Sequence, residues 1–196
     1  MKEEIATIVR LGVPAMLGQA GMMLLHAVDT MMLGHYGVSD LAAASLGTQW
    51  IFVTMTVAMG FVMGLDPQIA QAHGAQDRIG LIRAFHGGLG VAFLSALALS
   101  LAWSQTESVL LLFGQRPELA RRAAAYVQPQ IISTIPLLGW VALRSYLQGR
   151  GIMQPAMWVM LPVNLLNILF NWLFIYGNGG FAEYGLEGAA YATTLS

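Results

Sequence analysis

The sequence predicts an all-α fold: a polytopic integral membrane helical bundle with five complete transmembrane helices and the start of a sixth. Hydrophobic residues make up 57% of the 196 residues and charged residues only 10%, against roughly a quarter charged in an ordinary soluble domain. Glycine, which is commoner in transmembrane helices than in soluble ones, occurs 22 times. Uncharged stretches of the length needed to cross a bilayer, about 20 residues, recur along the chain.

Each predicted span is built around one of these uncharged stretches. The spans lie near residues 8–34, 41–65, 83–105, 120–147, 153–177 and, incompletely, 185–196. The first is not a cleavable signal peptide, because Glu3 and Glu4 stand where a basic start would be needed. The sixth reaches Ser196 without a charged flank, so we expect residues 1–196 to be one transmembrane unit of a longer chain.

Lys and Arg in the connecting segments predict the orientation, because cytoplasmic loops are enriched in them. With the N-terminus inside, six basic residues are cytoplasmic and three are external. The cytoplasmic ones are Lys2, Arg10, Arg78, Arg83, Arg144 and Arg150, and the external ones are Arg116, Arg121 and Arg122. We therefore expect a multi-pass protein of the plasma (inner) membrane with a cytoplasmic N-terminus.

Proline and the connecting segments refine this organisation. The segment "DPQIAQAHGAQDR" after the second span is mildly amphipathic and is expected along the inner interface, and Pro117 with Glu118 indicates a helix start. A proline inside a span removes a backbone hydrogen bond and favours a bend. Five prolines lie in or at the edge of spans, and we single out Pro14 because it shares the first helix with Asp29. The five are Pro14, Pro129, Pro136, Pro155 and Pro162.

Asp29 is a carboxylate at the far end of a span otherwise suited to lipid. An aspartate near the centre of a membrane helix costs roughly 2.5 to 3.5 kcal/mol, so it needs a partner or a watery cavity, and a functional role is the default hypothesis. The alternative is that Asp29, nineteen residues after Arg10, reaches the headgroups and faces water. His26 is three residues earlier and is either its hydrogen-bond partner or an ordinary interfacial histidine.

The fifth span carries a second polar cluster. Asn164, Asn167 and Asn171 lie at i, i+3 and i+7, on one stripe of a helix. Unpaired amides are penalised in hydrocarbon, so they must face protein or water. They are either polar contacts between helices or, together with Asp29, an oxygen-rich site that holds Na⁺ or a proton.

Other classes of function find no support in the sequence. The net charge is −1, so the chain has no excess of positive charge that would favour binding to nucleic acid. The four histidines have no metal-ligand spacing, there is no cysteine, and no catalytic or nucleotide-binding motif is present. We therefore expect no enzyme, no cofactor and no metal site other than Na⁺ at the polar cluster.

Five segments resemble the multidrug and toxic compound extrusion (MATE) transporters, especially the NorM-like branch. They are "LGVPAMLGQ", "VDTMMLGHYGVSDLAAASLG", "AQAHGAQD", "LRSYLQGRG" and "NILFNWLFIYG" followed by "GLEGAAYATT". The resemblance implies two related six-helix lobes around a central cavity, of which this chain is the N-terminal lobe and the C-terminal lobe is absent. It also implies a secondary antiporter that exports small cationic or amphiphilic compounds in exchange for H⁺ or Na⁺.

Within that resemblance, the ion- or proton-coupling residues map to Asp29, Asn167 and Asn171, with Ala192 and Thr193 of the sixth helix beside them. Pro14 corresponds to the proline at which the first helix bends, and Asn164 is left to packing. Some archaeal relatives carry an aspartate where this chain has Asn171, so the choice between H⁺ and Na⁺ stays open. Alternatives are a lipid-linked flippase of the same superfamily, which would be expected to carry basic residues in its spans, and a half-size scaffold or channel lobe that needs a partner chain.

Overall fold

The structure is a computed structural model that describes residues 2–152 and 154–196, and every described element is helical. The predicted all-α class is confirmed. The α-helices are α1 (Lys2–Tyr36), α2 (Val38–Met63), α3 (Asp66–Gly74), α4 (Arg78–Ser104), α5 (Thr106–Leu112), α6 (Pro117–Val127), α7 (Thr134–Gly149), α8 (Gln154–Phe174) and α9 (Gly185–Leu195). Two short 3₁₀ helices, η1 (Gln128–Ser133) and η2 (Asn178–Gly180), complete the set.

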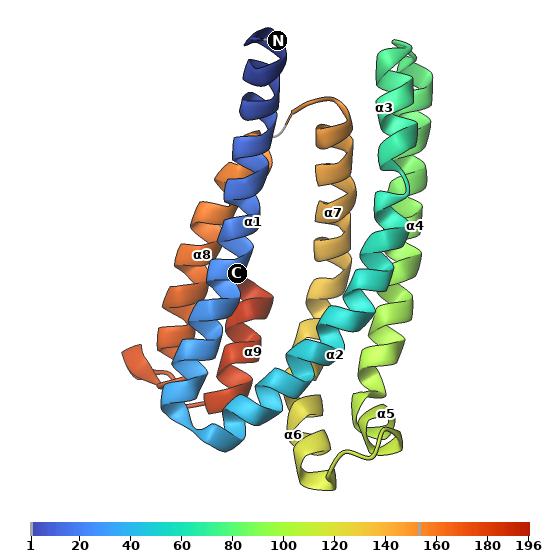
Figure 1. The fold of residues 1–196 in the computed structure, drawn as a ribbon. Coiled ribbons are helices and arrows are strands. Elements are labelled where there is room, and N and C mark those ends of the chain that lie inside the picture. The colour runs from blue at the N-terminus through green and yellow to red at the C-terminus, as the bar shows by residue number, and fades with distance from the viewer. Residues whose placement is uncertain (1, 153) are drawn as a thin grey trace.

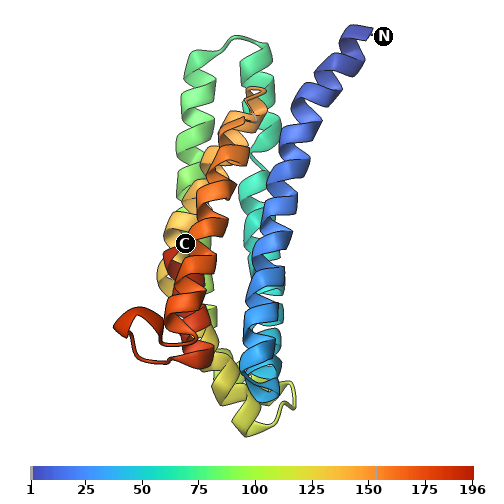
Figure 2. The ribbon, with the colours of Figure 1, turned by 90° about the vertical axis from the view of Figure 1, so that its left-hand side faces the viewer.

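The helices form an elongated bundle with two groups joined by α2 (Figure 1). One group consists of α1, α8 and α9, in which α8 packs against both of the others. The other contains α3, α4 and α7, with α4 packed along α7. Helix α2 crosses from the end of α1 to α4, and the turned view shows the start of α1 leaning away from the other helices (Figure 2).

The surface of α4 shows why this bundle suits lipid. Its inward face is made largely of small residues, with Ala92 and Ala96 fully or almost fully buried. The opposite face presents Leu94 and Leu101, which are 67% and 71% exposed. A soluble helix would place leucine inside and polar residues outside. The reversed pattern indicates that lipid covers the outer face.

Two helical stretches of the described residues are long and apolar enough to cross a bilayer: Val38–Gly74 and Arg78–Ser104. A shorter apolar helix covers Trp158–Phe174. Helices occupy all six predicted span positions, but the count of five complete spans stays a prediction.

The fourth predicted span, near 120–147, is not a continuous α-helix. It consists of α6, the 3₁₀ helix η1 and α7. Pro129 lies in the first turn of η1, where its missing N–H group weakens the α-helical hydrogen-bond ladder. Pro117 begins α6 as the sequence predicts, whereas Pro162 is accommodated inside α8.

The segment after the second span forms α3, which continues the course of α2 beyond a short turn at Gly64 and Leu65. It packs against α4 and α7 (Figure 1). The expected amphipathic connection is therefore part of the bundle.

Helix α9 is joined to the end of α8 by direct backbone contact. The N–H groups of Tyr184 and Gly185 donate to the carbonyl oxygens of Phe174 and Ile175, at 3.0 and 3.3 Å. A side chain at Gly188 would place its Cβ 2.4 Å from the Phe174 carbonyl oxygen. Glycine at this position lets the two helices approach closely enough to fix the place of α9.

Gly188→Ala should destabilise the fold, because the added methyl group meets backbone that cannot rotate away. We expect a loss of about 1–3 kcal/mol in the free energy of unfolding, seen as a lower Tm in detergent. Gly139→Ala in α7 is the matched control, because nothing lies within 4 Å of the added Cβ. Equal Tm values for the two variants would contradict the close contact.

Candidate functional site

Asp29 is buried, with 7% of its surface exposed, in the last two turns of α1. The amide nitrogen Nδ2 of Asn171 on α8 donates to Asp29 Oδ1 at 2.5 Å. The hydroxyl of Thr193 on α9 donates to Asp29 Oδ2 at 3.3 Å. The carboxylate thus lies where α1, α8 and α9 meet, and not at a water-facing surface.

Asn167 and Asn171 are both fully buried beside it. Asn171 Nδ2 also donates to Asn167 Oδ1, at 3.0 Å, so one amide group serves both neighbours. An ionised carboxylate only accepts hydrogen bonds, which requires the nitrogen of Asn171 to face Asp29. Its oxygen Oδ1 and the nitrogen Nδ2 of Asn167 have no hydrogen-bond partner among the described residues.

Asn164, the third member of the stripe, is buried in a different environment. Its Nδ2 donates to the carbonyl oxygen of Met160 in its own helix, at 2.7 Å. It also lies against α1, since a Cβ at Gly21 would be 3.5 Å from this nitrogen. The stripe therefore divides into two amides at the carboxylate and one at a helix contact.

The sixth-span residues join the site through α9. Ala192 is fully buried, and the Thr193 hydroxyl shares its one proton between Asp29 and the Ala189 carbonyl oxygen, which lies at 3.0 Å. Pro14 and His26 belong to α1, but their side chains lie outside the described residues.

Sequence reasoning missed the buried polar residues of α6 and η1. Tyr126 is buried and accepts a hydrogen bond from Thr48 of α2 at 3.5 Å, and a Cβ at Gly47 would come within 2.8 Å of its ring. Its backbone carbonyl accepts from Gln130 Nε2 at 3.0 Å. The periodicity of α6 gave no signal for the contact with Thr48, because it depends on how α2 crosses α6.

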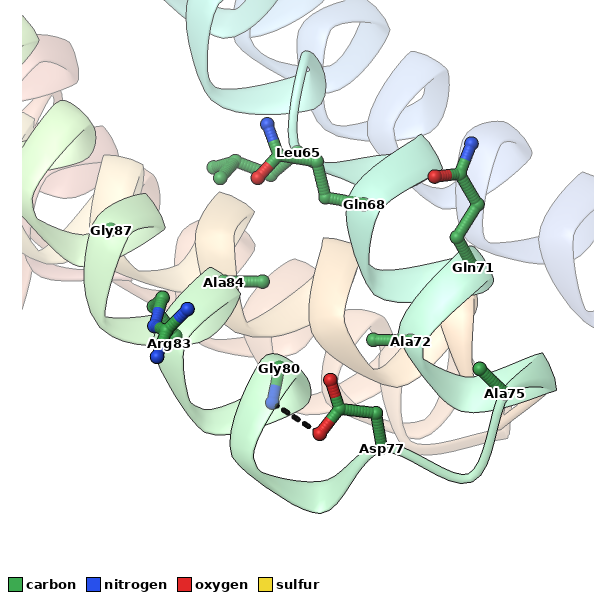
Figure 3. A pocket seen from close by; sticks show the side chains of 10 residues that line it. All are labelled: Leu65, Gln68, Gln71, Ala72, Ala75, Asp77, Gly80, Arg83, Ala84 and Gly87. Carbon is green, nitrogen blue, oxygen red and sulfur yellow. Dashed lines mark hydrogen bonds between the residues drawn. The ribbon is translucent and has the colours of Figure 1, made fainter.

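A separate hollow of about 550 Å³ lies between α3 and α4 (Figure 3). Asp77 caps the start of α4 there by accepting from the Gly80 N–H at 2.9 Å. Gln68, Gln71 and Arg83 also line it. None of the predicted site residues contributes to its wall, so it is distinct from the cluster at Asp29.

The family model MatE matches residues 14–173, a stretch that includes Asp29, Asn167 and Asn171. The chain belongs to the MatE family. This is a family of membrane multidrug efflux transporters, and the predicted resemblance is confirmed.

Several relatives resemble this MatE chain over its whole length. A probable multidrug resistance protein NorM of Bradyrhizobium diazoefficiens is 33% identical over 195 residues, which are 100% of this chain and 42% of the relative. The multidrug resistance protein NorM of Vibrio cholerae is 28% identical over 99% of this chain and 42% of its own length. The chain thus spans about two fifths of the length of these relatives.

Solved structures resemble the fold as well. A crystal structure of MATE in complex with MaD3S superposes with a TM-score of 0.86 at 26% identity, covering 96% of this chain and 42% of that one. A MOP superfamily transporter from Pyrococcus furiosus gives the same TM-score and identity, with 96% and 41% covered. The helix arrangement is therefore that of one part of a MATE transporter.

Thr193→Val should weaken the site, because valine keeps the shape of threonine but removes the donor to Asp29. We expect about 1 kcal/mol less stability, measured by thermal unfolding in detergent. Thr194→Val is the matched control, because the Thr194 hydroxyl donates to the Ala190 carbonyl of its own helix. A loss of the same size in both variants would show that the bond to Asp29 contributes nothing.

Proposed function

We propose that this chain is the N-terminal lobe of a secondary antiporter that exports cationic or amphiphilic compounds in exchange for H⁺ or Na⁺. Asp29 is the coupling group in this proposal, and Asn167, Asn171 and Thr193 are its partners. Membership of the MatE family supports the transport class. The observation that carries the coupling role is a buried carboxylate that meets an amide and a hydroxyl from two other helices.

The unpartnered amide oxygen gives the site a second hydrogen-bonding arrangement. With Asp29 ionised, Asn171 donates its nitrogen to the carboxylate and leaves Oδ1 without a described partner. A protonated Asp29 is itself a donor, and a turned Asn171 amide would offer it an acceptor. The two protonation states thus favour different positions of the same side chain.

Sodium is a second occupant that suits this chemistry. Na⁺, like other hard cations, is bound by carboxylate, amide and hydroxyl oxygens, and Asp29, Thr193 and a turned Asn171 amide would supply all three. Either ion alters the bonds between α1 and the pair α8 and α9. Since a ligand shifts a conformational equilibrium only through its different affinity for the two states, these bonds are where coupling would arise.

The alternative functions make different demands on the chain. A half-size scaffold or channel lobe is consistent with the 42% coverage of the relatives. A lipid-linked flippase would need basic residues in the cavity-lining helices, and the uncharged stretches at the centres of the spans contain none. Export measured with and without a co-expressed C-terminal lobe separates transport by this chain alone from transport that needs a partner.

Asp29→Asn should abolish ion-driven export while leaving membrane insertion intact, because asparagine keeps the shape and removes the ionisable group. The measurement is export of a fluorescent cation, with the protein expressed from its own gene so that any accompanying sequence is present. Glu187→Gln, a carboxyl change in the first turn of α9, is the control and should retain export. Undiminished export by Asp29→Asn would remove this residue from the mechanism.

Asn171→Ala should weaken the dependence of export on the coupling ion more than Asn164→Ala does. Only the first change removes a donor from Asp29, since Asn164 bonds to Met160. The loss of a hydrogen bond to a charged group is worth about 1.5–3 kcal/mol, or roughly ten- to a hundredfold in ion affinity. The readout is the half-saturating H⁺ or Na⁺ concentration, and equal shifts would show that the assignment of the stripe is wrong.

A further inference from the structure

Two oppositely charged side chains outside the Asp29 site each keep a buried atom without a hydrogen-bond partner. The atoms are Oδ1 of Asp66, the first residue of α3, and Nε of Arg144 in α7. Burying part of a charged group without a partner costs free energy, so such atoms require an explanation. The ion pairs of the described residues are Arg121–Glu107 and Arg122–Asp40, which involve neither side chain.

The packing of α3 on α7 sets the relative height of the two residues. A Cβ at Gly149 of α7 would lie 2.6 Å from Ile69 Cγ2 of α3, so these two residues are level. Both helices run in the same direction (Figure 1). Asp66 is three residues before Ile69 and Arg144 is five before Gly149, or about 4.5 and 7.5 Å back along the axes. The two charged residues are thus within one helical turn of each other in height.

Asp66 also lies on the side of α3 that meets α7. It is three residues from Ile69, and residues at this spacing share one face of a helix. Gln68 is on another face, where it lines the hollow between α3 and α4 (Figure 3). A long arginine side chain on α7 therefore has a carboxylate within its range of approach.

We propose that Asp66 and Arg144 are a switchable charge pair, apart in the conformation described here and joined across α3 and α7 in another conformation of the transport cycle. The inference rests on the proposed transport function, because alternating access requires the two ends of a carrier to open and close in turn. An ion pair present in only one conformation shifts the population toward it. The pair lies far from Asp29, because α3 is at the end of the bundle where α1 begins and Asp29 is near the end where α1 stops (Figure 1). Asp66 and Arg144 are therefore positioning residues, which act on the conformation and not on the coupling ion directly.

Cross-linking tests the approach of the two side chains without reference to transport. The sequence has no cysteine, so Asp66→Cys with Arg144→Cys introduces the only thiols of this chain. We expect a bifunctional thiol reagent, with a spacer about as long as the missing arginine side chain, to cross-link this pair in membranes about tenfold faster than Gln68→Cys with Arg144→Cys, since a direct disulfide would require a closer approach of the Cβ atoms. Equal rates for the two pairs, or no cross-link in the first, would overturn the proposal.

Export kinetics test the charge pair itself. Asp66→Asn and Arg144→Gln should each lower the maximal export rate about tenfold with an unchanged half-saturating substrate concentration, since the pair acts on the conformational step and not on binding. Asp66→Glu should retain much of the maximal export rate, because it keeps the carboxylate. The exchanged pair, Asp66→Arg with Arg144→Asp, should restore much of the rate that the single changes remove. Glu107→Gln, which removes a surface ion pair with Arg121 at 3.6 Å, is the control and should leave export unchanged.

The outcomes separate the two proposals. Rapid export by the parent together with unaltered rates in both single variants would overturn the charge pair and leave the antiport proposal standing. No export by the parent, with its accompanying sequence present, would overturn the antiport proposal, and the cross-linking rates would still decide whether Asp66 and Arg144 approach each other.

Discussion

The hydrogen bond between the Asn171 amide and the Asp29 carboxylate sets the main constraint on this lobe. A carboxylate in a bilayer costs several kcal/mol unless polar groups surround it. Its partners here come from helices far apart in the sequence, so α8 and α9 must converge on the last two turns of α1. The cost of one buried charge therefore dictates where three helices meet.

Small residues make that convergence possible. In lipid no hydrophobic force draws helices together, so association depends on close packing and on polar contacts. Gly188 brings α9 against the carbonyl of Phe174, and Gly21 brings α1 against Met160 and Asn164. The same logic shapes much of α4, where Ala92 and Ala96 face inward and Leu94 and Leu101 face outward.

The helix positions and most of the Asp29 site could be predicted from the sequence, because the free-energy cost of placing a residue in a bilayer depends mainly on the residue type. Uncharged stretches located the helices, and Asp29 with Asn167 and Asn171 formed a cluster before any geometry was known. The sequence could not rank the three asparagines by periodicity, since Asn164 shares their stripe; only the crossing of α1 over α8 separates them. The family resemblance did make that distinction.

The missed features all depend on tertiary contacts. The change from α6 to η1 follows from prolines whose effect on a helix depends on what neighbouring helices supply. Tyr126 needed the crossing of α2, and the charged residues Asp66 and Arg144 lie at the ends of predicted spans, where a charge is ordinary. Local sequence indicates the free-energy cost of placing a polar side chain in lipid. It does not indicate which atom of a distant helix will be its partner.

The backbone junction between α8 and α9 has a mechanical consequence. Both described partners of the acid, an amide and a hydroxyl, are carried by helices fastened to each other through main-chain atoms. The backbone bonds between α8 and α9 therefore hold these two partners in a fixed relation to each other where they meet α1. In the proposed antiporter, a proton or Na⁺ at Asp29 would change the contacts of α1 with both helices at once, so that one small chemical event could tilt the whole of α1.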